Sequence, residues 1–170
     1  EPHEPLPTVT VDEPDPNPNA RPWRRVESLQ EVLGGALIDR GCFLGNSRIW
    51  LAGHEGGQAC VILSTDAGET WDRVEIPLPM STIHDIEFVD PANGWLSCSG
   101  DPAIWRSADG GRTWKPQGHQ AGWAGNGRVT DLHILNPNVG FGAYTAPGAG
   151  SRLIAWNSRS RRWTNHDAGI

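Results

Sequence analysis

Aspartates are the side chains of this sequence whose spacing first suggests chemistry. Asp66 and Asp109 each stand five positions before a tryptophan, and Asp85 and Asp131 share a second repeated frame. Two carboxylates about 5–10 Å apart can hydrolyse a glycosidic bond, one as the acid and the other as the nucleophile or base. Asp85 and Asp131 are the one pair that we consider for this chemistry, and the alternative is that they form hydrogen bonds at the starts of strands. For Asp66 and Asp109 we expect a role in turns, where aspartate accepts backbone N–H groups.

The remaining chemistry-bearing side chains predict no catalytic residue, no metal site and no cofactor. Tyr144 is the only tyrosine, and we interpret it as a core or edge residue instead of a nucleophile. The six histidines lack the spacing of metal ligands, although His84 and His133 occupy neighbouring frames and could converge. Three cysteines leave at least one unpaired within the chain. If a disulfide forms, we expect Cys42 with Cys60, and the alternative is three buried thiols.

Internal repetition shows how these residues must be positioned. Ser64–Trp71 reads S-T-D-A-G-E-T-W and Ser107–Trp114 reads S-A-D-G-G-R-T-W, with the two tryptophans 43 positions apart. The frame Asp85–Trp95 returns as Asp131–Phe141 at a constant offset of 46. Such self-similarity at a fixed period indicates a repeat architecture.

A third unit is degenerate. Trp163 follows Trp114 after 49 positions, but Ser158 stands where the aspartate is expected. The turn before Trp163 carries three arginines: Arg159, Arg161 and Arg162. Upstream, the segment starting at Trp23 echoes the segment starting at Trp71, which leaves three units and one orphan strand.

A period of about 43–49 residues with four strands in each unit predicts the blades of a β-propeller. The fold class is therefore all-β, a partial, open propeller of three four-stranded antiparallel blades within residues 23–170. We expect the blades at about 36–76, 83–118 and 129–167. In the clearest unit the strands are predicted at 83–89, 95–99, 103–107 and 114–117, and the only helix around 27–34.

Residues 1–22 form a separate acidic, proline-rich arm. They hold seven of the 14 prolines and few apolar side chains, so we expect an extended arm that docks along a partner, and the alternative is that it packs on the body of its own chain. Residues 1–20 also contribute five negative charges to the net charge of −6. With no basic stripe, nucleic acid is not expected as a partner. The chain begins at Glu1 without an apolar leader segment, which fits a mature extracytoplasmic protein.

The repeated motif Ser-x-Asp-x-Gly-x-Thr-Trp resembles the Asp-box, or BNR, signature of sialidases, sortilin-type receptors, xyloglucanases and photosystem II assembly/stability factors. The last family is the most similar, because its units also combine an Asp85–Phe88 type of strand with Gly94-Trp95 and a box such as Ser107–Trp114. The resemblance covers about residues 23–167. It implies that the box residues have structural roles: Ser64, Asp66, Gly68, Trp71, Ser107, Asp109, Gly111, Trp114 and Trp163.

In that family the propeller is a non-enzymatic lumenal or periplasmic protein with about seven blades that binds membrane-protein complexes. By resemblance we expect a scaffold, stability or assembly subunit of such a complex, photosynthetic or otherwise bioenergetic. The alternative is a carbohydrate-binding or glycoside-hydrolase-like protein that acts as a homo-oligomer. Three blades leave two open faces, which we expect to be buried against a partner or a second copy. The candidate contact residues are Trp23, Trp105, Trp123, Arg159, Arg161 and Arg162. The alternatives are a solvated turn for the three arginines and a plug between loop and core for Trp123.

Overall fold

The computed structural model describes residues 26–79, 82–119, 127–148 and 150–166, which form one short helix and three β-sheets. The predicted arm over residues 1–22 lies outside the described residues. Helix α1 spans Glu27–Leu33, which confirms the helix predicted around 27–34. The first sheet has the strand order β1-β2-β3-β4, with β1 at Leu37–Leu44, β2 at Arg48–Glu55, β3 at Gln58–Ser64 and β4 at Asp72–Pro79.

The second sheet has four strands and the third has five. The second consists of β5 at Ile83–Phe88, β6 at Gly94–Cys98, β7 at Ile104–Ser107 and β8 at Lys115–Pro116, close to the predicted strands. The third consists of β10 at Arg128–Asn136, β11 at Val139–Ala146, β12 at Gly150–Asn157 and β13 at Arg162–Asn165, with β9 at Gly118–His119 added outside β13. Strand β9 follows β8 in the chain and pairs parallel to β13, so it ties the second sheet to the third.

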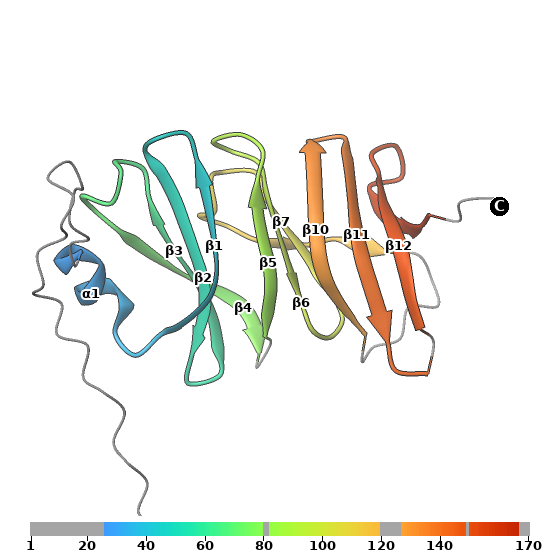
Figure 1. Ribbon diagram of the computed structural model, residues 1–170, viewed down its shortest axis with the longest axis horizontal. Coiled ribbons are helices and arrows are strands. Elements are labelled where there is room, and N and C mark those ends of the chain that lie inside the picture. The colour runs from blue at the N-terminus through green and yellow to red at the C-terminus, as the bar shows by residue number, and fades with distance from the viewer. Residues whose placement is uncertain (1–25, 80–81, 120–126, 149, 167–170) are drawn as a thin grey trace, which may run out of the picture.

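The three sheets follow one another along the long axis of the molecule, and their first strands β1, β5 and β10 are neighbours (Figure 1). Each sheet packs face to face against the next, as propeller blades do. The first and third sheets each keep one face without a neighbouring sheet in the described part of the chain. The prediction of an open, three-blade, all-β propeller is therefore confirmed, except that the third blade has a fifth strand.

Two hydrophobic cores hold the blades together, one at each junction. Alternation along the strands directs one set of side chains into each junction, as in β11, where Gly142, Tyr144 and Ala146 are buried. Tyr144 is 2% exposed, which confirms its interpretation as a core residue. The largest fully buried side chains include Trp50 in the first junction, and Trp95 and Trp163 in the second.

Neighbouring first strands are joined by bonds from backbone to side chain. Each acceptor lies on one strand and its N–H donor on the next: Cys42 Sγ from Phe88 at 3.3 Å, Asp85 Oδ2 from Leu132 at 2.8 Å and Glu87 Oε2 from Ile134 at 2.5 Å. The structure thus supports the alternative in which Asp85 forms hydrogen bonds instead of acting as a catalytic carboxylate.

The two intact boxes are turns organised by their serine and aspartate. In the second box, Ser107 Oγ accepts the Gly111 N–H at 2.8 Å and Asp109 Oδ1 accepts the Thr113 N–H at 2.9 Å. Gly111 has φ +92°, a conformation that glycine adopts without strain, and an added Cβ would lie 3.1 Å from the Trp50 ring. The same bonds form in the first box around Ser64 and Asp66.

The third turn is not a degenerate box but a shorter turn. Asn157 pairs with Arg162, so only four residues connect β12 to β13, whereas eight connect the paired residues that flank each intact box. Asn157 Oδ1 organises the turn by accepting two backbone N–H groups at 3.1 Å. The prediction that Trp163 ends a box is therefore wrong. Trp163 lies on β13 opposite Trp156, and its ring N–H has no hydrogen-bond partner among the described residues.

Two further predictions are corrected. Cys42 and Cys60 do not pair, because β2 lies between their strands. Two strands in a sheet are separated by about 5 Å per step, so residues two strands apart are too distant for a disulfide. Trp105 is not an exposed contact residue: it is 6% exposed in the first junction, and its ring N–H donates to the Pro102 carbonyl at 3.0 Å.

Candidate functional site

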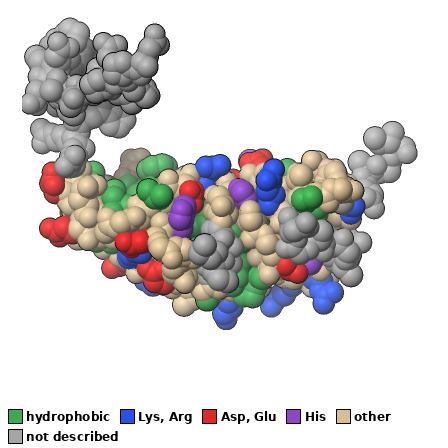
Figure 2. Space-filling view, turned by 90° about the horizontal axis from the view of Figure 1, so that it is seen from below, with side chains coloured by type: hydrophobic (Ala, Val, Ile, Leu, Met, Phe, Trp, Pro, Cys, Tyr) green, Lys and Arg blue, Asp and Glu red, His purple; other side chains and the backbone are tan. Residues whose placement is uncertain are grey.

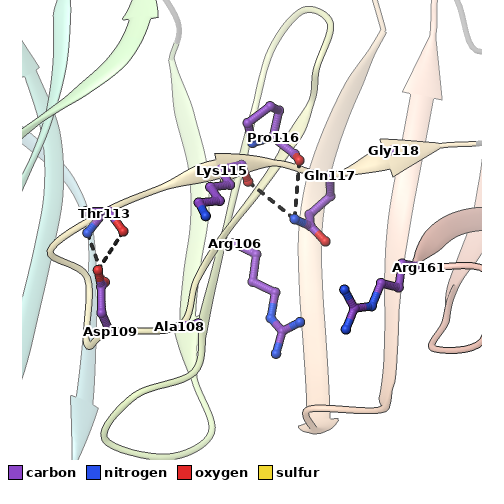
Figure 3. A pocket seen from close by; sticks show the side chains of 9 residues that line it. All are labelled: Arg106, Ala108, Asp109, Thr113, Lys115, Pro116, Gln117, Gly118 and Arg161. Carbon is purple, nitrogen blue, oxygen red and sulfur yellow. Dashed lines mark hydrogen bonds between the residues drawn. The ribbon is translucent and has the colours of Figure 1, made fainter.

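A basic pocket of about 430 Å³ lies where the second sheet meets the third. It is bounded by the second box turn, strands β7 and β8, the start of β9 and the turn before β13. The lining residues are Arg106, Ala108, Asp109, Thr113, Lys115, Pro116, Gln117, Gly118 and Arg161 (Figure 3). Three of these nine side chains are cations.

Arg106 is held in place from two sides. Its Nη2 donates to Asn93 Oδ1 at 2.8 Å, and its guanidinium carbon lies 5.0 Å from the centre of the Trp95 ring. A guanidinium over an aromatic face is stabilised by the ring quadrupole. Its buried Nε has no partner among the described residues. The side chain is therefore preorganised, with hydrogen-bonding capacity left unused.

Lys115 and Arg161 reach the same pocket from different blades. Lys115 is directly opposite Arg106 in the β7–β8 pair. Arg161 comes from the third blade, because the parallel pairing of β9 with β13 brings Arg162 beside Gly118. In Figure 3 the guanidinium groups of Arg106 and Arg161 are turned toward one another across the pocket.

The single carboxylate in the lining forms no salt bridge with these cations. Asp109 Oδ1 accepts the Thr113 N–H and the Ser107 hydroxyl, and Oδ2 accepts the Thr113 hydroxyl. Partial burial would raise the pKa of Asp109, but these hydrogen bonds outweigh it and the pKa lies below its usual value. No described carboxylate lies within salt-bridge distance of Arg106, Lys115 or Arg161. The pocket is suited to an anionic group, above all a carboxylate bound by two prongs of an arginine.

Sequence reasoning found part of this site. Arg161 lines the pocket as one of the three predicted arginines, Arg162 lines an adjoining hollow of about 450 Å³, and Arg159 is exposed on the turn. Trp23 and Trp123 lie outside the described residues. Arg106 and Lys115 were missed, although a signal exists. Like charges directly opposite on neighbouring strands are destabilising, and such a pair indicates a function for the charges.

The candidate catalytic and metal residues form no reactive set. Asp85 is occupied by the Leu132 and Ile86 amides at 2.8 Å each, and burial raises its pKa. His84 contacts the Ser99 hydroxyl at 2.7 Å, whereas His133 lies near Glu87 at 3.6 Å, so the two histidines have separate partners. In the described ranges no three His, Cys, Asp or Glu side chains are grouped as metal ligands. Nor does a described helix have the length and apolar character to cross a bilayer.

The comparisons with known proteins support the fold. No family model matches the chain, and no curated protein matches it. The structure is similar to that of YCF48 bound to D1 peptide, at 19% identity and a TM-score of 0.59, covering 76% of this chain and 40% of that one. It is also similar to YCF48 from Cyanidioschyzon merolae, at 18% identity and a TM-score of 0.50, covering 66% of this chain and 34% of that one. A GH74 xyloglucanase from Xanthomonas campestris is similar over 76% of this chain and 30% of its own, at 16% identity and a TM-score of 0.40.

The present chain thus spans less than half the length of the structures that it resembles. Identities below 20% establish the fold and leave function to be argued from the site. Together, the repeated box turns, the blade-to-blade cores and the similarity to the two YCF48 structures show that the described residues fold as an arc of three β-propeller blades with Asp-box turns.

Proposed function

We propose that this protein is a non-catalytic scaffold that binds a partner protein through an acidic segment seated in the basic pocket. The observation that carries the proposal is the convergence of Arg106, Lys115 and Arg161 from two blades, with no described carboxylate within salt-bridge distance of any of them. Such a convergence costs stability unless a ligand supplies negative charge. The propeller then supplies a rigid frame that fixes the spacing of the three cations.

The partner, in this proposal, belongs to a membrane-protein complex of photosynthetic or other bioenergetic type, and the protein assists its assembly or stability from an extracytoplasmic compartment. The similar YCF48 structure contains a bound D1 peptide, which supports a protein ligand on this fold. The basic pocket agrees with a peptide ligand, because carboxylate side chains are the anions that a peptide offers.

The test is a fluorescence-anisotropy titration of the full chain with a labelled acidic peptide and with the same peptide carrying Gln and Asn in place of Glu and Asp. We expect binding of the acidic peptide only, weakened at least about tenfold by Arg161→Glu or Lys115→Glu, as for loss of one charged contact. Arg48→Glu is the matched control, since it makes the same charge change on the first sheet. Equal binding by Arg161→Glu and Arg48→Glu would contradict the proposal.

A further inference from the structure

Large exposed apolar side chains gather at the two ends of the arc. In the described ranges they are exposed by 38–68% of their surface, and none belongs to the second sheet. At one end they are Val26, Leu37, Ile38 and Phe43, and at the other Leu135, Val139 and Leu153.

These ends correspond to the two halves of a blade junction. Phe43, Phe88 and Ile134 hold the same register position on β1, β5 and β10. Phe88 packs against the preceding blade and so does Ile134, whereas no blade precedes Phe43 among the described residues and its side chain is 68% exposed. We call the face of the first sheet that carries Ile38 and Phe43 the front face.

The opposite end is the other half of the junction. Trp50 and Trp95 point from their blades toward the following one, and Phe141 holds the same position on β11. Val139 lies on the same side of β11 as Phe141, and Leu153 is opposite Ala143 on that side. We call this surface, formed by Val139, Phe141 and Leu153, the back face.

The backbone contacts also repeat in register. Asp131 is placed on β10 as Asp85 is on β5, and Asp85 accepts an amide from the next blade. Leu132 on β10 donates that amide N–H, and Gly41 holds the same register position on β1. The back face therefore presents the Asp131 carboxylate as an acceptor. The front face presents the Gly41 N–H at the position of the corresponding donor.

Charge distinguishes between the ways in which two copies could meet. Residues 26–79 carry eight acidic and three basic side chains, whereas residues 127–166 carry one acidic and five basic. Figure 2 shows acidic side chains gathered toward the end of the first sheet and Lys and Arg toward the other end. Opposite ends attract and like ends repel, which favours front-to-back contact.

Helix α1 leaves room for such a contact. It covers the outer part of the first sheet, where Ser28 Oγ donates to the Gly68 carbonyl at 3.2 Å and Arg73 Nη1 donates to the Leu33 carbonyl at 3.0 Å. The exposed side chains of Ile38 and Phe43 lie on β1, at the inner edge of the same sheet.

We propose that the back face of one copy docks on the front face of a second copy, with Phe43 against Phe141 and Asp131 accepting the Gly41 N–H. The contact is heterologous, so two or more arcs close a ring where the rotation permits. It uses a different surface from the basic pocket, and either proposal can fail without the other.

Light scattering on the purified chain tests this contact. We expect at least twice the 18.5 kDa monomer mass for the wild type, and the monomer mass for Phe43→Asp or Leu153→Asp alone. Both positions are exposed, so the variants should keep the wild-type circular dichroism. An equimolar mixture of the two variants should recover twice the monomer mass, because each retains the face that the other lacks.

Three outcomes would overturn the proposal. One is a wild type that stays monomeric at every concentration. Another is an oligomer that survives either substitution, since a front-to-back contact needs both faces. The third is a variant mixture that remains monomeric, since each variant keeps the face that the other lacks.

Discussion

The Trp50 ring of the first blade stacks on the Phe88 ring of the second, with ring centres 3.8 Å apart and planes 5° apart. Trp50 also donates its ring N–H to the Gly110 carbonyl of the second box at 2.8 Å. One side chain thus joins the first blade both to the inner strand and to the box turn of the next. Buried aromatic pairs of this kind contribute beyond the area that they bury.

Replacing Trp50 should therefore destabilise the arc as a whole. We expect Trp50→Ala to lower the free energy of unfolding by about 3–5 kcal/mol, the usual cost of deleting a buried aromatic side chain. Trp50→Phe keeps a ring on Phe88 and should lose less, although the Gly110 carbonyl is left without this donor. Urea unfolding followed by circular dichroism measures both. Equal losses for the two variants would show that the stack contributes nothing.

Much of this fold could be predicted from sequence because its units repeat. Turn chemistry at Ser107, Asp109 and Gly111 is local, so the motif alone identifies the turn and the strands on either side. The third turn was misinterpreted because the buried Trp163 keeps its place while the loop before it is four residues shorter. A tryptophan at the expected spacing reports the core position, not the loop that precedes it.

The basic pocket was harder to predict because it depends on pairing across blades. Arg161 and Lys115 are 46 positions apart, and they meet only because β9 leaves the second sheet and pairs with β13. No period in the sequence marks a two-residue strand. Trp105 was misplaced for a related reason: its position on β7 directs it into the first junction, and strand direction is a tertiary property.

The carboxylate of Asp109 should be more important for stability than for ligand binding. Asp109→Ala removes the acceptor of the Thr113 N–H and of two hydroxyls, and we expect a loss of about 1–3 kcal/mol. Asp109→Asn keeps one acceptor oxygen and should lose less. The melting temperatures of the two variants measure the difference. If Asp109→Ala melts like the wild type, the box does not stabilise the turn.

The inner-strand carboxylates should make stability depend on pH. Burial raises the pKa of Asp85 above 3.8 and that of Glu87 above 4.5, and the N–H bonds that they accept offset this only in part. The folded chain therefore holds these protons more tightly than the unfolded chain. The protonated carboxyls stabilise the fold fully below their pKa values in the unfolded chain. This contribution is lost as the pH rises through their raised pKa values in the folded chain.

Asp85→Asn isolates this effect. Relative to the wild type, the variant should gain stability as the pH is raised from 4 toward 7, because it has no buried charge to create. Urea midpoints at a series of pH values give the difference, and Asp72→Asn is the control at an exposed position. A difference that stays constant with pH for Asp85→Asn would mean that burial does not hold the proton on Asp85.

The first box should respond to acid in the opposite direction. The Thr70 hydroxyl, the Thr70 N–H and the Ser64 hydroxyl all donate to Asp66 and lower its pKa to about 2. The stabilising contribution of the Asp66 carboxylate is therefore present above pH 3.8, and it is lost as the pH falls toward 2. Asp66→Asn should remove this acid sensitivity, which unfolding curves between pH 4 and pH 2 would detect. An unchanged acid transition would assign the sensitivity to other groups.

The thiols of Cys42 and Cys60 should react slowly and in a defined order. Burial raises the pKa of Cys42 and of Cys60, so little thiolate forms near neutral pH. Cys60 is fully buried, whereas Cys42 is half-buried on the inner strand. Mass spectrometry after iodoacetamide treatment should show Cys42 labelled at least about tenfold faster than Cys60 in the native chain, and all three cysteines labelled in urea. Equal labelling rates of Cys42 and Cys60 in the native chain would mean that the first blade opens as readily at β3 as at β1. Resistance of Cys42 and Cys60 to labelling in urea would indicate that they form a disulfide after all.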